Sequence, residues 1–219
     1  MQVGPDWRLT PERAAIHLPT ATVVVADLHL GYDRVRQRSG EAIPFRSLEG
    51  ELRPLRDLLA REGLHRLAIA GDLFEDPRRG RDELVADLCG WLEEVGAELV
   101  GVVPGNHDRG LAGAALPLAP NGLELGVWHI VHGDQPLPDG PVMQGHDHPS
   151  LRWGQAAGPC FLVSDRHVVL PAYSRDAAGV NVLTQRRWEQ HRCVVVAGTE
   201  LLDFGAVGPL RRRLRTDRS

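Results

Sequence analysis

Five short polar motifs occur in order along this chain, and each directly follows a short apolar run rich in β-branched residues. The motifs are Asp27-Leu28-His29, Gly71-Asp72, Gly105-Asn106-His107-Asp108, His132-Gly133-Asp134 and Gly145-His146-Asp147-His148. The runs before them cover residues 22–26, 67–70, 99–103, 127–131 and 141–144. Each run predicts a buried strand with a polar residue at its carboxyl end. Because open α/β sheets place their sites at that edge, the motifs predict an α/β fold with one shared site.

The side chains in these motifs are carboxylates, imidazoles and one carboxamide, all of which can bind metal ions. Residues separated by one position on a strand share a face, so Asp27 and His29 can present an oxygen and a nitrogen together. His146 and His148 repeat this spacing. Oxygen and imidazole ligands without thiolates suit Mn²⁺, Fe or Zn²⁺, and not a structural cysteine-bound zinc. The two oxygens of Asp72 can bridge two ions about 3.5–4 Å apart.

Helical periodicity separates the first predicted strands. Apolar residues recur every three to four positions over residues 46–62 and 81–95, which predicts two amphipathic helices. Alternating strands and helices favour parallel pairing with right-handed crossovers. Beyond residue 120 the helical pattern stops, and short strands at 159–163, 167–170 and 192–196 predict a second, more antiparallel sheet.

Composition sets the broad class of the protein. The chain has 219 residues with neither an internal repeat nor a long linker, so we expect a single domain over residues 1–210. Its net charge of −4 gives no general attraction to nucleic acid, and all 25 basic residues are arginine. Residues 211–219 contain five arginines and one aspartate, which predicts a flexible basic tail or, alternatively, an arm that grips nucleic acid.

The cysteines and the N-terminus indicate the compartment. Cys89, Cys160 and Cys193 are isolated and form no C-x-x-C spacing, so we expect reduced thiols. The first residues do not follow the pattern of a signal peptide, and no apolar run approaches the ~18 residues that span a bilayer. We therefore expect a cytoplasmic protein without membrane contact.

The ordered set D-x-H, G-D, G-N-H-D, H-G-D and G-H-x-H resembles the calcineurin-like metallophosphoesterase superfamily. Segments 25–31, 70–74, 145–149 and 169–174 further resemble the bacterial DNA-ligase-associated metallophosphoesterases, described as DNA damage response endonucleases. The resemblance extends from residue 7 to about residue 205. It implies a two-sheet β-sandwich flanked by helices, in four α/β/β/α layers, with two bound divalent ions, for which Mn²⁺ is the first choice.

The resemblance also implies a role for each motif residue. One ion would be held by Asp27, His29 and His148, with Asp72 bridging to a second that Asn106, His132 and His146 would complete. His107 matches the catalytic histidine of the superfamily, which contacts the scissile phosphate. Glu75 matches the acidic residue that orients this histidine in many members, whereas the ligase-associated group often has histidine there. Asp108, Asp134 and Asp147 lie at motif positions that do not bind metal, and we expect them to support the ligands through hydrogen bonds.

Arginines near the motifs are the predicted substrate contacts. Arg34 and Arg36 follow the first motif, Arg109 follows the third, and arginine binds phosphodiester oxygens well. The other arginines close to motif loops are Arg78, Arg79, Arg81, Arg152 and Arg175. Nearby aromatic residues that can stack on bases are Tyr32, Trp153 and Tyr173. The alternative is that these arginines are ordinary solvated or salt-bridged side chains.

Three functions follow from this pattern. The first is a two-metal phosphodiesterase that cuts DNA, an endonuclease in repair with a DNA ligase or helicase as partner. The second keeps the chemistry but acts on a small phosphoester such as a nucleotide, a cyclic nucleotide or a nucleotide-diphospho-lipid. The third is a non-catalytic scaffold, against which the presence of His107 argues. No Gly-rich nucleotide-binding loop is found, so ATP-driven chemistry is disfavoured, and the oligomeric state is left open.

Overall fold

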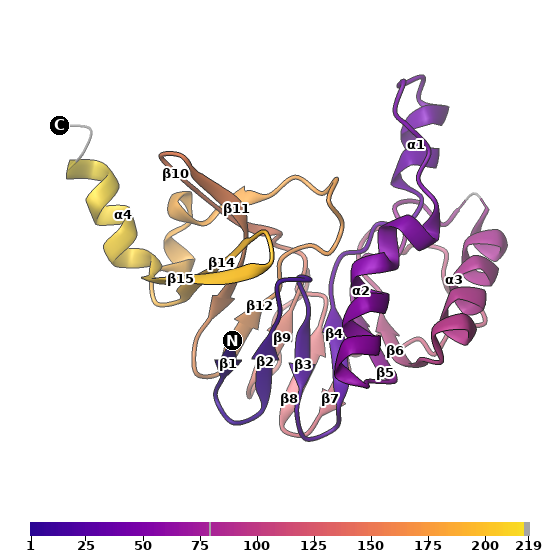
Figure 1. Ribbon diagram of the computed structural model, residues 1–219, viewed down its shortest axis with the longest axis horizontal. Helices are drawn as coiled ribbons and strands as arrows, with labels where there is room; N and C mark the ends of the chain where they lie inside the picture. The colour runs from indigo at the N-terminus through magenta and orange to yellow at the C-terminus, as the bar shows by residue number, and fades with distance from the viewer. Residues whose placement is uncertain (79, 217–219) are drawn as a thin grey trace.

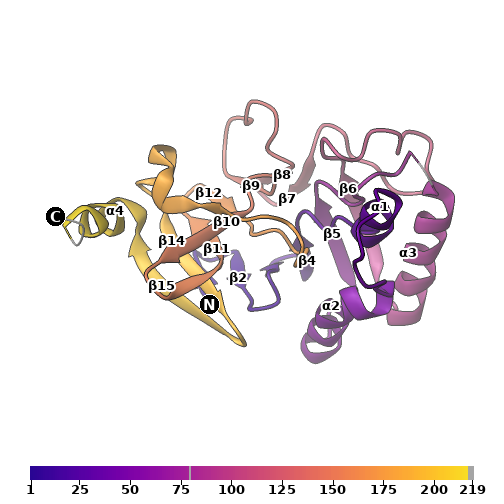
Figure 2. The same cartoon turned by 90° about the horizontal axis from the view of Figure 1, so that it is seen from above.

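Two β-sheets packed face to face form the centre of the structure, and helices cover both outer faces (Figure 1 and Figure 2). The computed structural model describes residues 1–78 and 80–216. One outer layer contains α2 (Leu48–Glu62) and α3 (Arg81–Val95). The other contains α4 (Val207–Thr216) and two short 3₁₀ helices, η1 (Val182–Thr184) and η2 (Arg186–Trp188). This is the four-layer α/β/β/α order that the family resemblance implies.

The first sheet carries the first three motifs. Its order is β1-β2-β3-β4-β5-β6, in which β1 to β4 are antiparallel and β4, β5 and β6 are parallel. Helices α2 and α3 connect the parallel strands, as the alternating periodicities predict. The strands are β1 (Gln2–Val3), β2 (Trp7–Leu9), β3 (Ala15–His17), β4 (Thr22–Val25), β5 (Arg66–Ala70) and β6 (Glu98–Val103).

The second sheet carries the last two motifs and is mostly antiparallel, as predicted. Its order is β13-β10-β11-β12-β9-β8-β7, with β14 pairing β11 and β15. The parallel pairs are β8 with β9, β9 with β12, and β10 with β13. The strands are β7 (Leu123–Leu125), β8 (Trp128–Val131), β9 (Val142–Gln144), β10 (Pro149–Trp153), β11 (Ala156–Val163), β12 (His167–Val169), β13 (Val180–Asn181), β14 (Arg192–Ala197) and β15 (Glu200–Ala206).

Three hydrophobic cores hold the four layers together. The first lies between α2, α3 and the first sheet and contains Trp91; the second lies between the sheets and contains Phe161. The third joins the second sheet to α4 and contains Trp188. Because the first sheet is covered on both faces, β4 is buried throughout, and its sequence is a continuous apolar run without alternation.

Helix α4 corrects the sequence analysis, which predicts no helix beyond residue 120, whereas the flexibility of the tail from residue 211 stays a prediction. Residues 207–216 form one helix, and Val207 and Leu210 are buried in the third core. The segment has only three apolar residues, Val207, Leu210 and Leu214, among four arginines, and the partners that bury the first two lie far along the chain. Residues 217–219 of the predicted tail lie outside the described residues. Neither α4 nor any other described helix combines the length and apolar character needed to cross a bilayer.

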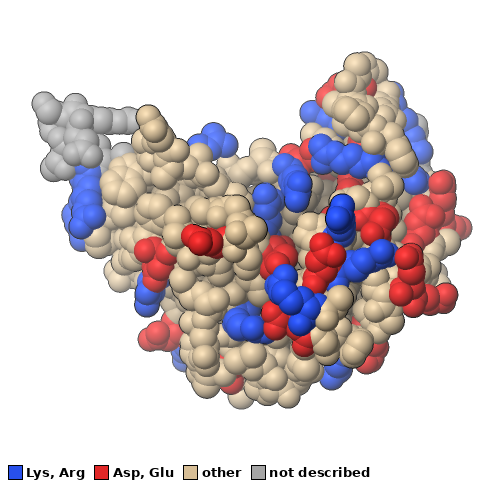
Figure 3. All heavy atoms as spheres, in the orientation of Figure 1, with Lys and Arg blue, Asp and Glu red and all other residues tan. Residues whose placement is uncertain are grey.

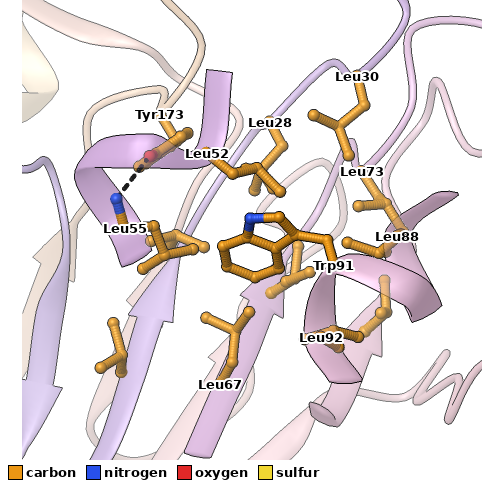
Figure 4. Close-up of a cluster of buried hydrophobic side chains, with 14 of the residues drawn as sticks. Leu28, Leu30, Leu52, Leu55, Leu67, Leu73, Leu88, Trp91, Leu92 and Tyr173 are labelled. Carbon is orange, nitrogen blue, oxygen red and sulfur yellow. Dashed lines mark hydrogen bonds between the residues drawn. The ribbon is translucent and has the colours of Figure 1, made fainter. Parts of the chain in front are cut away.

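Helix α2 contains a proline, and a tyrosine from a distant loop compensates for it. Pro54 lacks an N–H, and its ring disturbs the preceding turn. At this turn the Leu55 amide donates to the Tyr173 hydroxyl (3.2 Å) (Figure 4), which donates to the Glu51 carbonyl (3.3 Å). The hydroxyl thus joins a donor and an acceptor that would bond directly in a regular helix. Burial raises the pKa of Tyr173, which keeps this hydroxyl protonated.

We expect Tyr173→Phe to lower the free energy of unfolding by about 1–3 kcal/mol, because the Leu55 amide and the Glu51 carbonyl lose their shared partner. Urea denaturation at neutral pH measures this change. Tyr32→Phe is the matched control, because Tyr32 is only half-buried and lies on α1 (Tyr32–Arg38), outside this turn. Equal effects of the two substitutions would contradict the role of the Tyr173 hydroxyl.

The first turn of α2 also carries a partly buried acid. Burial and the neighbouring Asp33 carboxylate raise the pKa of Glu51 to about 7, against the opposing charge of Arg46. Asp33 itself is buried and accepts hydrogen bonds from the backbone N–H groups of Arg34 and Arg46, both at 2.8 Å. Glu51 therefore holds its proton in the folded chain at pH values where the unfolded chain has released it.

The sign of the resulting pH dependence follows from linkage. Between pH 4.5 and about 7 the folded state binds more protons at Glu51 than the unfolded state, so stability falls as pH rises through this window. Glu51→Gln removes this loss, and we expect the variant to be about 1–2 kcal/mol more stable than wild type at pH 8, after allowance for solvent screening. Urea denaturation at pH 5 and pH 8 measures the difference. The exposed Glu93→Gln is the control, and a Glu51→Gln curve parallel to wild type would refute the assignment.

Candidate metal centre

The five motifs meet at one place, where the carboxyl ends of parallel strands from both sheets lie together. Strands β4, β5 and β6 end directly before the first three motifs, and β8 and β9 end directly before the last two. Backbone hydrogen bonds join the neighbouring loops: the His29 N–H donates to the Asp72 carbonyl (2.9 Å), and the Gly145 N–H donates to the His132 carbonyl (3.0 Å). The two sheets therefore build the shared site that the strand-end pattern predicts.

Left-handed backbone conformations are concentrated at this site. Five of the seven described non-glycine residues with positive φ are predicted metal ligands, namely Asp27 (54°), His29 (50°), Asp72 (38°), His146 (66°) and His148 (42°). Such conformations cost about 1–2 kcal/mol for residues with a Cβ. They persist only where the surrounding structure enforces them, so the fold holds these side chains in place at the expense of its own stability.

Two motif glycines allow side chains to approach the backbone closely. A Cβ atom at Gly71, where φ is 89°, would overlap the His132 ring. A Cβ atom at Gly105 would overlap the Asp72 carboxylate. Glycine at these positions is therefore required for the ligand side chains to converge.

Asp27 is fully buried and is contacted by three histidines. Its Oδ2 accepts a hydrogen bond from the His146 backbone N–H (2.7 Å) and lies 3.5 Å from His148 Nε2. Its Oδ1 lies 3.5 Å from His132 Nδ1. The backbone N–H thus fixes one oxygen, and both oxygens face imidazoles from the second sheet.

Asp72 is 2% exposed and is held in a similar way. Its Oδ1 accepts a hydrogen bond from the His107 backbone N–H (2.8 Å). Its Oδ2 lies 3.6 Å from His132 Nε2 and 3.9 Å from His29 Nε2. Asp72 therefore contacts histidines of both predicted metal sites, as a bridging carboxylate must.

His132 links the remaining predicted ligands to this cluster. Its Nε2 lies 3.0 Å from Asn106 Oδ1 and 3.1 Å from His146 Nδ1. All seven predicted metal ligands are thus brought together, while their division between two ions stays a prediction. His146 lies at the exposed edge of the cluster, and His148 is half-buried.

The cluster has the electrostatic features of a cation site. The ion-pair partners of the buried carboxylates Asp27 and Asp72 are all histidines within the described part of the chain. Four buried atoms of the cluster that could bind a metal ion have no hydrogen-bond partner among the described residues. They are Asp27 Oδ1, His29 Nε2, His132 Nδ1 and His148 Nε2. Unpaired buried groups cost about 1–3 kcal/mol each, and bound cations would satisfy them.

Two groups of donor atoms are close enough to hold an ion each. Among the described residues, one group is Asp27, Asp72 and His132 and the other is His29, Asp72 and His107, and within each group the donor atoms lie within 4.8 Å of one another. The family resemblance assigns His107 to catalysis and not to metal binding, so in the second group it leaves His29 and Asp72 as the predicted ligands. Asp72 belongs to both groups. The carboxylate and imidazole donors fit two divalent ions that share one carboxylate.

Glu75 contacts two histidines at the edge of the cluster. Its Oε2 lies 2.8 Å from His29 Nδ1 and 3.5 Å from His107 Nδ1, and its carbonyl oxygen lies 3.1 Å from His107 Nδ1. The hydrogen bond with His29 lowers the pKa of Glu75. Burial alone would lower the pKa of His29, but Glu75 and the aspartate charges outweigh it, and the net pKa is raised. The sequence predicts a partnership with His107, whereas the shortest contact of the carboxylate is with His29.

Asp108 supports two of the ligand loops by accepting hydrogen bonds from their backbone. It is 4% exposed, and its carboxylate accepts hydrogen bonds from the backbone N–H groups of Leu73 (3.0 Å), Phe74 (3.0 Å) and Gly105 (2.9 Å). Burial raises the pKa of Asp108 against the effect of these bonds. This is the supporting role expected for it, whereas Asp134 is exposed and accepts a hydrogen bond from its neighbour Gln135.

A chain of hydrogen bonds that the sequence analysis missed holds the loop of the last motif. Gln144 Nε2 donates to Asp147 (2.9 Å), and its Oε1 lies 3.0 Å from His167 Nε2. His167 Nδ1 lies 3.2 Å from His191 Nε2, and Arg187 donates to Asp147 from the other side. These histidines match no motif, so their contribution becomes visible only once the strands are paired.

The segment 171–174 anchors the first ligand loop. Its backbone N–H groups donate to the carbonyl oxygens of Ala26 (2.7 Å) and Asp27 (3.1 Å). Arg13 in turn donates to carbonyl oxygens of residues 172–174. The segment therefore has a structural role beside the metal cluster, which explains why it adjoins the motifs in space.

The arginines predicted to bind substrate differ in their surroundings. Arg34 pairs with Glu83 (3.2 Å) and a second acid of α3, and Arg36 pairs with Glu41 (3.2 Å). Arg109 is exposed beside the third motif. Arg79 lies outside the described residues. The alternative, that these arginines are ordinary solvated or salt-bridged side chains, holds for Arg34 and Arg36 and also for Arg78 and Arg81, which pair with Asp76 and Asp82.

The overall structure is similar to that of Pseudomonas putida nuclease MPE. The TM-score is 0.68 at 20% sequence identity, with 90% of this chain and 94% of that chain covered. The chain has the calcineurin-like metallophosphoesterase fold. No family model and no curated protein matches the sequence. The likeness concerns the fold, and the ligase-associated subfamily stays a prediction.

Metal binding at this cluster predicts a measurable stabilisation. We expect Mn²⁺ at about 100 times its dissociation constant to add about 2.7 kcal/mol to the stability of metal-stripped protein. Asp72→Asn should lose most of the resulting rise in melting temperature, because the shared ligand loses its charge. Asp139→Asn, an exposed change outside the cluster, should respond like wild type. Thermal unfolding with and without Mn²⁺ measures the shift, and equal shifts in wild type and Asp72→Asn would refute the site.

Proposed function

We propose that this protein is a metal-dependent phosphodiesterase and that its substrate is DNA. The observation that carries the proposal is the pair of donor groups that share Asp72, together with the side chain of His107, which belongs to one of these groups and is 38% exposed. A carboxylate shared by two ions is a recurrent arrangement in enzymes that transfer phosphoryl groups. The structural neighbour from Pseudomonas putida is a nuclease by name, which supports the same class of reaction.

Bound divalent ions would supply a water of lowered pKa and would neutralise charge on the phosphate oxygens. The chain supplies the remaining groups. The Asp27 and Asp72 carboxylates are each oriented by a backbone N–H, so their free lone pairs point in fixed directions. Preorganised ligands of this kind avoid the cost of rearrangement during the reaction.

His107 is the candidate proton donor. Its Nδ1 lies 3.1 Å from the Glu75 carbonyl oxygen, a contact in which Nδ1 is the donor, so Nε2 is the ring nitrogen available to substrate. As an imidazolium, His107 can give the Nε2 proton to the departing ester oxygen or stabilise charge on it. Glu75 acts as a positioning residue, because it contacts both His107 and His29.

The finer parts of the proposal rest on the sequence resemblance. We assign Mn²⁺ as the ion, with Fe or Zn²⁺ as alternatives, and an endonuclease activity in DNA repair. A DNA ligase or helicase is the proposed partner, and the cytoplasm is the proposed location. The likeness in fold supports the reaction class but carries none of these details.

The test is nicking of supercoiled plasmid by metal-stripped protein, with and without added Mn²⁺. We expect His107→Ala to lower kcat by about 10²–10⁴-fold, because a general acid is lost, while the metal content per chain stays unchanged. Activated aryl esters need little protonation of the leaving group and should respond less to this substitution.

His65→Ala is the matched control, because His65 is exposed next to the amino end of β5, at the opposite end of that strand from the cluster. An unchanged nicking rate in His107→Ala would refute the role of His107. If metal-loaded wild type hydrolyses a small phosphoester but leaves plasmid intact, the substrate part of the proposal fails and the small-phosphoester alternative takes its place.

A further inference from the structure

A groove of about 290 Å³ opens beside the metal cluster, at His148. It is lined by the start of β10, by β11 and by the segment 172–179. Figure 3 shows the surface hollowed between the part of the molecule that carries β10 and β11 and the projecting α1, with basic side chains on its sides. The groove lies on the part of the molecule that carries β10 and β11, and Figure 1 shows these strands well apart from α1.

The charged side chains that line the groove are all basic. Its lining contains three arginines, Arg13, Arg152 and Arg175, together with two serines, but no aspartate or glutamate among the described residues. This contrasts with the chain as a whole, which has a net charge of −4. A concave surface with one sign of charge concentrates ligands of the opposite sign, here anions.

Two of these arginines are free to bind a ligand. Arg152 and Arg175 are exposed, and neither has an acidic partner within the described ranges 1–78 and 80–216. Arg34 and Arg36 on the α1 side are both engaged by acids, as described above. The two arginines of α1 that were predicted to bind substrate are thus already paired, whereas Arg152 and Arg175 in the groove are available for phosphate contacts.

Arg13, the third arginine of the groove, is held in place by hydrogen bonds. Its guanidinium donates to the backbone of residues 172–174, and burial together with the charge of Arg175 lowers its pKa. Two cationic side chains are therefore held near one another without a carboxylate. Like charges in such an arrangement repel, and a bound anion relieves the repulsion.

Six of the residues that line the groove have small side chains. They are Ala157, Gly158, Pro159, Ala172, Ala177 and Gly179. None of them has a side chain long enough to obstruct an extended chain lying over it. A groove lined by small residues and arginines matches the sugar–phosphate backbone of a nucleic acid strand.

We propose that this groove binds the nucleic acid strand on one side of the scissile bond, with Arg152 and Arg175 contacting phosphates that flank the one at the metal cluster. The proposal rests on the proposed phosphodiesterase function and extends it, because it makes the substrate a polymer and assigns the residues that read its backbone. A small phosphoester would occupy the cluster and leave the groove unused.

The test compares a long and a short substrate in the double variant Arg152→Gln/Arg175→Gln. With a 20-nucleotide single-stranded DNA, we expect kcat/KM to fall by about 10–100-fold. With bis(p-nitrophenyl) phosphate, which reaches only the cluster, we expect kcat/KM to stay within about twofold of wild type. Each lost phosphate contact reduces the salt slope of log Kd by about 0.7, so the double variant should lose about 1.4.

Binding is measured separately from cleavage, by fluorescence anisotropy of the labelled oligonucleotide with metal-stripped protein. Arg152→Lys/Arg175→Lys, which keeps the charges, should restore most of the salt slope. Arg66→Gln removes one positive charge at the amino end of β5, away from the groove, and should behave like wild type. Melting temperatures of all variants report whether they are folded.

The possible outcomes separate the two proposals. If wild type cleaves the oligonucleotide and the glutamine variant binds and cleaves it equally well, the groove proposal is wrong and the phosphodiesterase function stands. If wild type binds the oligonucleotide through these arginines but hydrolyses neither substrate, the proposed function fails and the groove remains. Equal losses on both substrates, or no binding of DNA by wild type, would also overturn the groove proposal.

Discussion

The rest of the structure depends on holding two carboxylates, Asp27 and Asp72, buried close to each other. An oxygen of one lies within 4.8 Å of an oxygen of the other, which at an effective dielectric constant of 20 corresponds to a repulsion of about 3 kcal/mol when both are charged. The fold adds left-handed backbone conformations at both residues and leaves neighbouring donor atoms unpaired. Each of these features lowers the stability of the metal-free chain, and bound cations would relieve the repulsion and satisfy the unpaired atoms. The site is therefore built for an ion-bound state, and the surrounding layers must supply enough stability to maintain it.

Two kinds of interaction meet this demand. Asp108 joins two ligand loops of the first sheet through three backbone N–H groups, so the loops cannot move apart independently. The segment 171–174 connects the Asp27 loop to the second sheet, and Tyr173 connects the same segment to the turn of α2 at Pro54. The ligands are thus fixed relative to three of the four layers. A small shift of any of these layers would therefore move the ligand side chains.

The sequence predicts those features that are local, and it fails where the cause lies far along the chain. Each ligand motif directly follows its strand in the sequence, so the apolar pattern alone predicts that the motifs lie at the carboxyl ends of the strands. The shortest contact of Glu75, the hydrogen-bonded chain through Gln144 and His167, and helix α4 depend on pairings between segments that no local pattern encodes. The same holds for Arg34 and Arg36, whose nearness to a motif gives no sign that acids of other segments neutralise them.

This last difference bears on how substrate specificity arises on such a fold. A metal cluster recognises any phosphoester, so selectivity must come from groups outside it. An arginine that already has a carboxylate partner must break that contact before it binds phosphate, whereas an unpaired arginine gives its full interaction energy to the ligand. Arg152 and Arg175 are of the second kind and lie on a path that begins at His148. The sequence does not distinguish the two kinds of arginine. Only the positions of the acidic residues in the folded chain show which arginines form ion pairs and which can bind a nucleic acid strand.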